Sequence, residues 1–133
     1  MREIKFRGKR IDNGEWVYGH YHFANWYDPK TLQIVDTTHS ILPIDRQDSH
    51  RVNPATVGQY TGLRDKNGQE IYEGDICKDA RGFRFVVVWD DNARFLGRGI
   101  GAQREYIRYV GQEPAVEVIG NIHDNPELLE VSV

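Results

Sequence analysis

Apolar and polar residues alternate over short stretches of this chain, and no window shows the long 3.6-residue period of an amphipathic helix. The clearest alternation covers residues 3–11 and 16–23, which flank Asn13-Gly14, a dipeptide typical of type I′ turns. A two-residue loop there places Phe6 opposite Tyr21 and Arg10 opposite Val17. We therefore predict an N-terminal β-hairpin.

Strand side chains alternate with period two, so the predicted hairpin has two chemically different faces. One face is apolar and contains Ile4, Phe6, Tyr21 and Phe23. The other face is cationic and aromatic, with Lys5, Arg7, Lys9, Trp16, Tyr18, His20 and His22. One feature opposes this register, because it sets Asp12 against Glu15, a pair of like charge.

The middle of the chain has weaker patterns. Residues 24–55 are interpreted as irregular, with Pro29 ending the first extended stretch and a short strand near Ile34 and Val35. The polar run from Asp45 to Pro54 is typical of a linker or surface loop. These features predict two parts, an N-terminal hairpin region (1–53) and a C-terminal domain (54–133).

The C-terminal part has short strand patterns at regular spacing. A second Asn-Gly turn falls at Asn67-Gly68, and the nearly continuous apolar run at 83–89 predicts a strand buried on both sides. Further strand candidates are 94–96, 106–110 and 116–119, and Asn125 and Pro126 can start a short helical turn. We therefore expect a mostly β protein whose second part is a small barrel or sandwich.

Composition narrows the function classes. The chain has 133 residues, a net charge of −3 and 39% apolar residues. No apolar run approaches the ~20 residues that a membrane span needs, and no secretory signal is present, so we expect a cytoplasmic protein without membrane contact. The single Cys77 excludes an intramolecular disulfide and is interpreted as a core residue. Positive charge is concentrated in residues 1–10, whereas residues 117–133 contain acids and no Lys or Arg.

Other motifs are better explained by structure than by chemistry. Residues 97–102 match G-x-G-x-x-A, but too few residues follow for a crossover helix, so we predict a flexible glycine turn. His20 and His22 share a strand face and could supply part of a metal site, but no third ligand lies nearby. Acids cluster at Glu70, Glu73 and Asp75 and at Asp90 and Asp91, but Glu73-Gly74-Asp75 and Asp90-Asp91-Asn92 fall at expected turns between strands. We therefore assign no catalytic residue, no metal ligand and no cofactor.

Residues 56–76, TVGQYTGLRDKNGQEIYEGDI, resemble the YopX family of phage and prophage proteins. Similar segments are REIKFRGKR near the start, WVYG at 16–19, VVVWDD at 86–91 and VEVIGNIHDNPELLE at 116–130. The resemblance implies a mostly β protein with a small barrel of the Src-homology-like type in its C-terminal part. It also implies a bacteriophage or prophage origin, and it transfers no activity or catalytic residue. The segment 94–113 departs from the spacing usual in the family.

Three classes of function remain open. The first is a self-associating interaction or assembly module, because tryptophan, tyrosine and arginine are typical anchors of protein interfaces. The second is a nucleic-acid-binding accessory protein, in which Lys5, Arg7 and Lys9 neutralise phosphates and the neighbouring rings stack on bases. The third is a metal- or carboxylate-dependent enzyme. We favour the first, since acids are interspersed with the basic residues and the net charge is negative.

Overall fold

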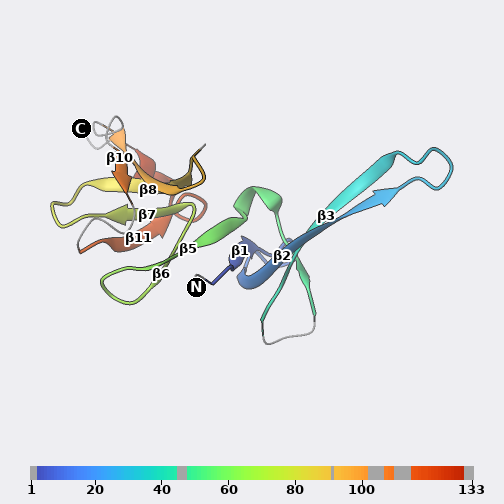
Figure 1. Ribbon diagram of the computed structural model, residues 1–133, viewed down its shortest axis with the longest axis horizontal. Coiled ribbons are helices and arrows are strands. Elements are labelled where there is room, and N and C mark those ends of the chain that lie inside the picture. Colours follow the sequence, from blue (N-terminus) through green and yellow to red (C-terminus); the bar gives the residue numbers. More distant parts are fainter. Residues whose placement is uncertain (1–2, 45–47, 91, 102–106, 110–114, 131–133) are drawn as a thin grey trace. The chain divides into compact units, whose positions relative to one another are not determined.

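The computed structural model describes residues 3–44, 48–90, 92–101, 107–109 and 115–130, and it is built from short antiparallel strands (Figure 1). The predicted mostly β class is confirmed. The chain divides into two compact units, Glu3–Gln59 and Tyr60–Val133, the second of which also includes Met1–Arg2. Each unit is described by itself below.

The N-terminal unit contains four strands, one 3₁₀ turn and the beginning of a fifth strand. They are β1 (Phe6–Lys9), β2 (Trp16–Tyr27), β3 (Ile34–Leu42), β4 (His50–Arg51), η1 (Pro54–Thr56) and the first residues of β5 (Gly58–Arg64). These strands pair in the order β4-β3-β2-β1-β5. Val17, Ile41 and Val52 form the buried core of this unit, and Phe6, Tyr21 and Val57 pack around them.

The predicted two-residue turn of the first hairpin is wrong. β1 pairs with β2 from Phe6 opposite Gly19 to Lys9 opposite Trp16, and residues 11–14 form a four-residue loop. Arg10 Nη2 donates to Asp12 Oδ2 at 2.6 Å inside this loop, so Asp12 no longer faces Glu15 in a strand pair. The register differs from the predicted one by two residues, an even number, so both predicted faces keep their membership.

The predicted irregular middle region is also wrong over residues 24–42. β2 continues to Tyr27 and pairs with β3 from His20 opposite Leu42 to Tyr27 opposite Ile34, with a bulge beside Trp26. Pro29 lies at the tip of the hairpin, where its missing N–H interrupts no ladder. The tip is held by Asp28, whose Oδ1 accepts the Lys30 N–H at 2.7 Å. The result is a two-stranded ribbon that extends well beyond β1 (Figure 1).

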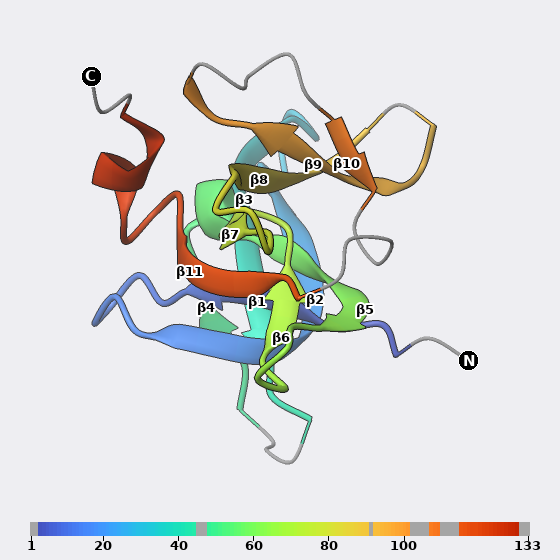
Figure 2. The same ribbon diagram turned by 90° about the vertical axis from the view of Figure 1, so that its left-hand side faces the viewer.

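The C-terminal unit contains the remainder of β5 and all later elements. They are β6 (Glu70–Tyr72), β7 (Asp75–Lys78), β8 (Arg84–Trp89), β9 (Phe95–Gly99), β10 (Ile107–Tyr109), β11 (Glu117–Asn121) and the 3₁₀ turn η3 (Pro126–Leu129). Five strands pair in the order β10-β9-β8-β7-β11, as seen in Figure 2, and β5 pairs with β6. The hydrogen bonds of the described residues leave β10 and β11 at the two ends of an open sheet, so they do not close the expected barrel.

Three details of this unit correct the sequence predictions. β8 is not buried on both sides, because Phe85 and Val87 on one face are buried whereas Val86 and Val88 on the other face are only half-buried. Gly97 and Gly99 of the glycine motif belong to β9 rather than to a flexible turn, and a Cβ at Gly97 would lie 2.3 Å from the Phe85 ring. Ala102 of the motif lies outside the described residues. Asn125 precedes η3 as expected, but its side chain accepts the Asn121 N–H instead of capping the turn. The prediction that Cys77 is a core residue is confirmed.

Three hairpin turns of the C-terminal unit share one design. Each begins with an aspartate, at 65, 79 and 90, whose Oδ1 accepts the backbone N–H groups two and four residues later. The residue three positions after each aspartate has a positive φ. These residues are Gly68 (84°), Gly82 (86°) and Ala93 (59°). Alanine is the exception, since its Cβ is disfavoured in the left-handed region.

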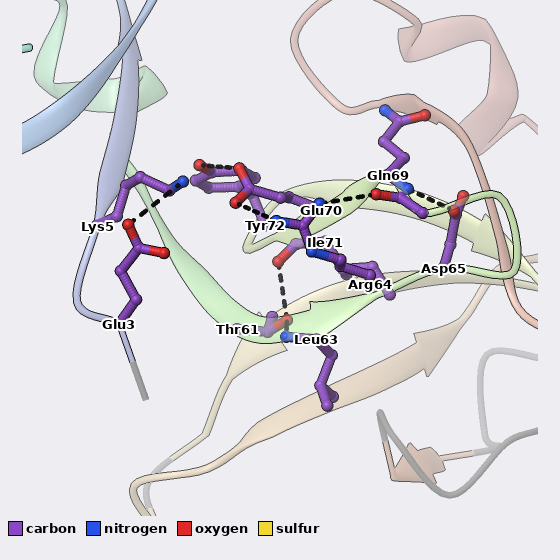
Figure 3. Close-up of polar contacts among 11 residues, drawn as sticks. Glu3, Lys5, Thr61, Leu63, Arg64, Asp65, Gln69, Glu70, Ile71 and Tyr72 are labelled. Carbon is purple, nitrogen blue, oxygen red and sulfur yellow. Dashed lines mark hydrogen bonds and ion pairs between the residues drawn. The ribbon is translucent and has the colours of Figure 1, made fainter. Parts of the chain in front are cut away.

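Asp65 has a role beyond its own turn. Its Oδ1 accepts from Asn67 and Gln69, the latter contact being visible in Figure 3, while Oδ2 accepts the Val118 N–H of β11 at 3.0 Å. Burial alone would raise the pKa of the Asp65 carboxyl, but the three N–H donors and the nearby Lys66 outweigh it and hold this pKa below its ordinary value. The ionised carboxylate therefore links two hairpins of the unit.

We expect Ala93→Gly to stabilise the protein and Gly82→Ala to destabilise it, each by about 0.5–1 kcal/mol, because the two positions have the same backbone conformation. A Cβ at Gly82 would meet no atom within 4 Å, so the change tests the backbone alone. Urea denaturation measures both effects. Equal stability of the two variants would contradict the assigned turn geometry.

We expect Asp65→Asn to lower the free energy of unfolding by about 1–3 kcal/mol at pH 7, because an amide replaces the charged acceptor of three buried hydrogen bonds. Since the folded pKa of Asp65 is depressed, the stabilisation is complete above the unfolded pKa of about 3.9 and is lost as pH falls through the folded value. Denaturation between pH 7 and pH 2 should therefore show the two proteins converging only under acid. The control Asp90→Asn removes hydrogen bonds within one turn only, so it should lower the free energy of unfolding by less than Asp65→Asn does.

Candidate interaction site

The predicted cationic and aromatic face is present on β1 and β2, but its cations are engaged within the unit. Arg7 is only 6% exposed, and its Cζ atom lies 4.6 Å from the centroid of the Trp16 ring. Lys9 Nζ lies 5.6 Å from the same centroid, and Lys5 Nζ lies 3.7 Å from the Glu3 carboxylate. The face thus presents stacked cation–π contacts in place of a row of extended positive charges.

The aromatic and histidine members of the same face are more accessible. Tyr18 is 45% exposed, and His20 and His22 are exposed on β2. His22 Nε2 lies 3.0 Å from Ser49 Oγ, at hydrogen-bonding distance. No group of three His, Cys, Asp or Glu side chains among the described residues could hold a metal ion. The nucleic-acid hypothesis for this face stays a prediction.

A shallow cavity of about 360 Å³ adjoins this face. Its lining residues are Arg10, Glu15, Trp16, Val17, Tyr18, Pro43 and His50. The hydrogen bond from Arg10 to Asp12 raises the pKa of the guanidinium and lowers that of the carboxyl. Arg10 is therefore already committed to an ion pair with Asp12 at the edge of the cavity.

The acidic residues considered as catalytic candidates have structural partners. Asp75 is 1% exposed, and its Oδ2 accepts the Tyr72 N–H at 2.7 Å. Glu70 accepts the Tyr72 hydroxyl at 3.0 Å, and Arg64 lies 3.6 Å from its other oxygen (Figure 3). Asp90 belongs to a hairpin turn, and Asp91 lies outside the described residues. Asp75 and Asp90 therefore stabilise turns as expected, whereas Glu70 belongs to strand β6.

The surface that the sequence patterns missed lies at the far end of the β2–β3 ribbon. We call residues 23–35 the arm. Half of the twelve large apolar side chains that the described residues expose belong to it, namely Phe23, Trp26, Tyr27, Leu32, Ile34 and Val35. Each is at least 55% exposed, with Leu32 reaching 75%. The aromatic pair Trp26-Tyr27 and the β-branched pair Ile34-Val35, which have high strand propensity, were the signal that could have revealed it.

The arm is ordered by its own cross-strand contacts. The Thr37 hydroxyl donates to Asn25 Oδ1 at 2.8 Å, and the Trp26 indole N–H donates to Thr38 Oγ1 at 3.2 Å. Its charges are few, with Asp28 and Lys30 at the tip and Asp36 just beyond the arm on β3. An apolar, nearly neutral, well-ordered ribbon is suited to contact with another protein surface.

Comparison with known proteins agrees with the resemblance noted from the sequence. The crystal structure of protein EF1440 from Enterococcus faecalis is similar to this chain, with a TM-score of 0.53 and 26% identity. The match covers 98% of this chain and 100% of that one. No curated protein matches the chain. Within the described residues, no helix has the length and apolar character required to cross a membrane.

A family model described as YopX protein matches residues 5–130, which includes every described strand and 3₁₀ turn of both units. The chain belongs to the YopX family.

Proposed function

We propose that this protein is a non-enzymatic interaction or assembly module that binds protein through the arm. The supporting observation is the concentration of exposed apolar side chains at residues 23–35, far from the buried cluster of Val17, Ile41 and Val52. A two-stranded ribbon is at best marginally stable alone in water, and exposed apolar patches mark sites of contact. A bound protein surface would support the two-stranded ribbon and would cover its exposed apolar side chains.

The charge of the arm favours protein over nucleic acid as the partner. Phosphate binding needs several lysines or arginines, and the arm contains only Lys30, beside Asp28. On the hairpin face, Arg7 is buried against Trp16 and Lys5 lies beside Glu3. Nucleic-acid binding by that face is the alternative, in which Tyr18 and the two histidines would be the accessible groups.

The setting of this function is part of the proposal. The likeness to YopX proteins is the basis for placing the protein in a bacteriophage or prophage, acting in the cytoplasm of the bacterial host. An assembly role suits that setting, because an exposed arm presented by a folded β unit can join copies or partners without any catalytic group.

The proposal is tested with an arm variant that combines Tyr27→Ser, Leu32→Ser and Val35→Ser. We expect the wild-type chain to associate with protein, measured by sedimentation of the pure chain and by retention of bacterial proteins on the immobilised chain. The arm variant should bind at least tenfold more weakly, either to itself or to the retained bacterial protein, because its exposed apolar contacts are removed.

The matched control combines Ile11→Ser, Ile44→Ser and Leu129→Ser, three apolar residues outside the arm that are also exposed. It should retain association within about twofold of the wild type. Equal losses in both variants, or a wild-type chain that neither self-associates nor retains protein, would overturn the proposal. Salt-sensitive retention of nucleic acid that Arg7→Glu weakens would favour the alternative.

A further inference from the structure

The outer edge of β2 is open over the distal half of the strand. β1 pairs with β2 only as far as Gly19, whereas β3 pairs with it from His20 to Tyr27. Among the described residues, no strand pairs with β2 on the side away from β3 beyond Gly19. This edge is therefore available for pairing with another β-strand.

The direction of the backbone groups along this edge follows from one hydrogen bond on β3. The His39 C=O accepts the Val52 N–H at 2.9 Å, so the backbone of His39 faces away from β2. Phe23 lies opposite His39. In an antiparallel pair, the backbone N–H and C=O groups of two opposed residues point either toward each other or away from each other. The backbone groups of Phe23 therefore point away from β3. Phe23, and with it Tyr21 and Asn25, therefore directs its N–H and C=O groups toward the open edge.

The composition of β2 lacks the usual protection of an edge strand. All twelve residues from Trp16 to Tyr27 are uncharged, and none is proline. Soluble proteins commonly guard such edges with lysine, proline or a very short strand. The open edge strand β3 differs, because it contains the charged Asp36.

We propose that β2 of a second copy of this chain pairs antiparallel with this edge, about a two-fold axis at Phe23. Tyr21 then lies opposite Asn25 of the second copy, and the two Phe23 side chains lie opposite each other. On the other face, Trp26 lies opposite His20 of the second copy. This inference rests on the proposed function and names the partner and the mode of contact.

Symmetry fits a second copy, and the exposed area limits how tightly it would bind. Each copy offers the same neutral edge once, so an isologous pairing satisfies both edges and closes at a dimer instead of extending into a fibre. The exposed parts of Phe23, Trp26 and Tyr27 amount to roughly 500–900 Å² in two copies, taking aromatic side chains at about 150–250 Å² each. Stable interfaces bury about 1,200–2,000 Å², so backbone pairing must contribute and the dimer should be reversible.

A pair of proline variants tests the edge. Asn25→Pro and Thr37→Pro both remove the hydrogen bond between these two side chains, and both place proline where the N–H points away from the β2–β3 ladder. Only Asn25 lies on the proposed edge. Sedimentation equilibrium should show a dimer dissociation constant at least tenfold higher for Asn25→Pro and changed by less than about twofold for Thr37→Pro.

A charge-exchange experiment tests the two-fold register without relying on proline. Phe23→Lys and Phe23→Glu should each be monomeric, because identical charges meet at the axis, and an equimolar mixture should form the heterodimer. Circular dichroism verifies that each variant is folded. A mixture that stays monomeric while the wild type dimerises would overturn the register.

A wild-type chain that remains monomeric at several hundred micromolar would overturn the inference, as would equal effects of the two proline changes. The proposed function would survive that result if the arm variant with three serines still lost a retained bacterial protein. Dimerisation unaffected by both the arm variant and Asn25→Pro would instead overturn both proposals.

Discussion

The N-terminal unit depends on one close approach, at the point where β2 changes its neighbour. A Cβ at Gly19 would lie 2.1 Å from the Leu42 carbonyl oxygen, so only glycine allows β3 to join β2 immediately after β1 leaves it. Because of this exchange, one strand of twelve residues contributes to the core at one end and to an exposed ribbon at the other. The arm, its open edge and the proposed contact with a second copy all follow from it.

The C-terminal unit is organised by aspartates instead. The side chains at 65, 79 and 90 each satisfy two backbone N–H groups of a hairpin turn, and Asp65 also reaches Val118. A turn stabilised by a carboxylate resembles a cluster of catalytic acids when only the sequence is visible. Of the acids considered as catalytic candidates, Asp90 has this role, because its carboxylate accepts the backbone N–H groups of Asn92 and Arg94.

Several elements were predictable because they depend on local patterns. Alternation identified both faces of the first hairpin, and these survived a wrong turn because a shift of two residues preserves side-chain orientation. The register itself was missed because the ion pair between Arg10 and Asp12 favours a longer loop. Gly97 appeared to belong to a flexible turn, since its contact with Phe85 joins neighbouring strands and leaves no local signal.

By itself, the sequence determined the β class, the faces of the first hairpin, the core position of Cys77 and the resemblance to YopX proteins. These properties depend on residue type and spacing along the chain. Only the tertiary structure decided that Arg7 is buried against Trp16 and that the apolar residues of the arm are exposed. An alternating strand has the same pattern whether or not something covers it, because burial depends on which distant segments pack against each face.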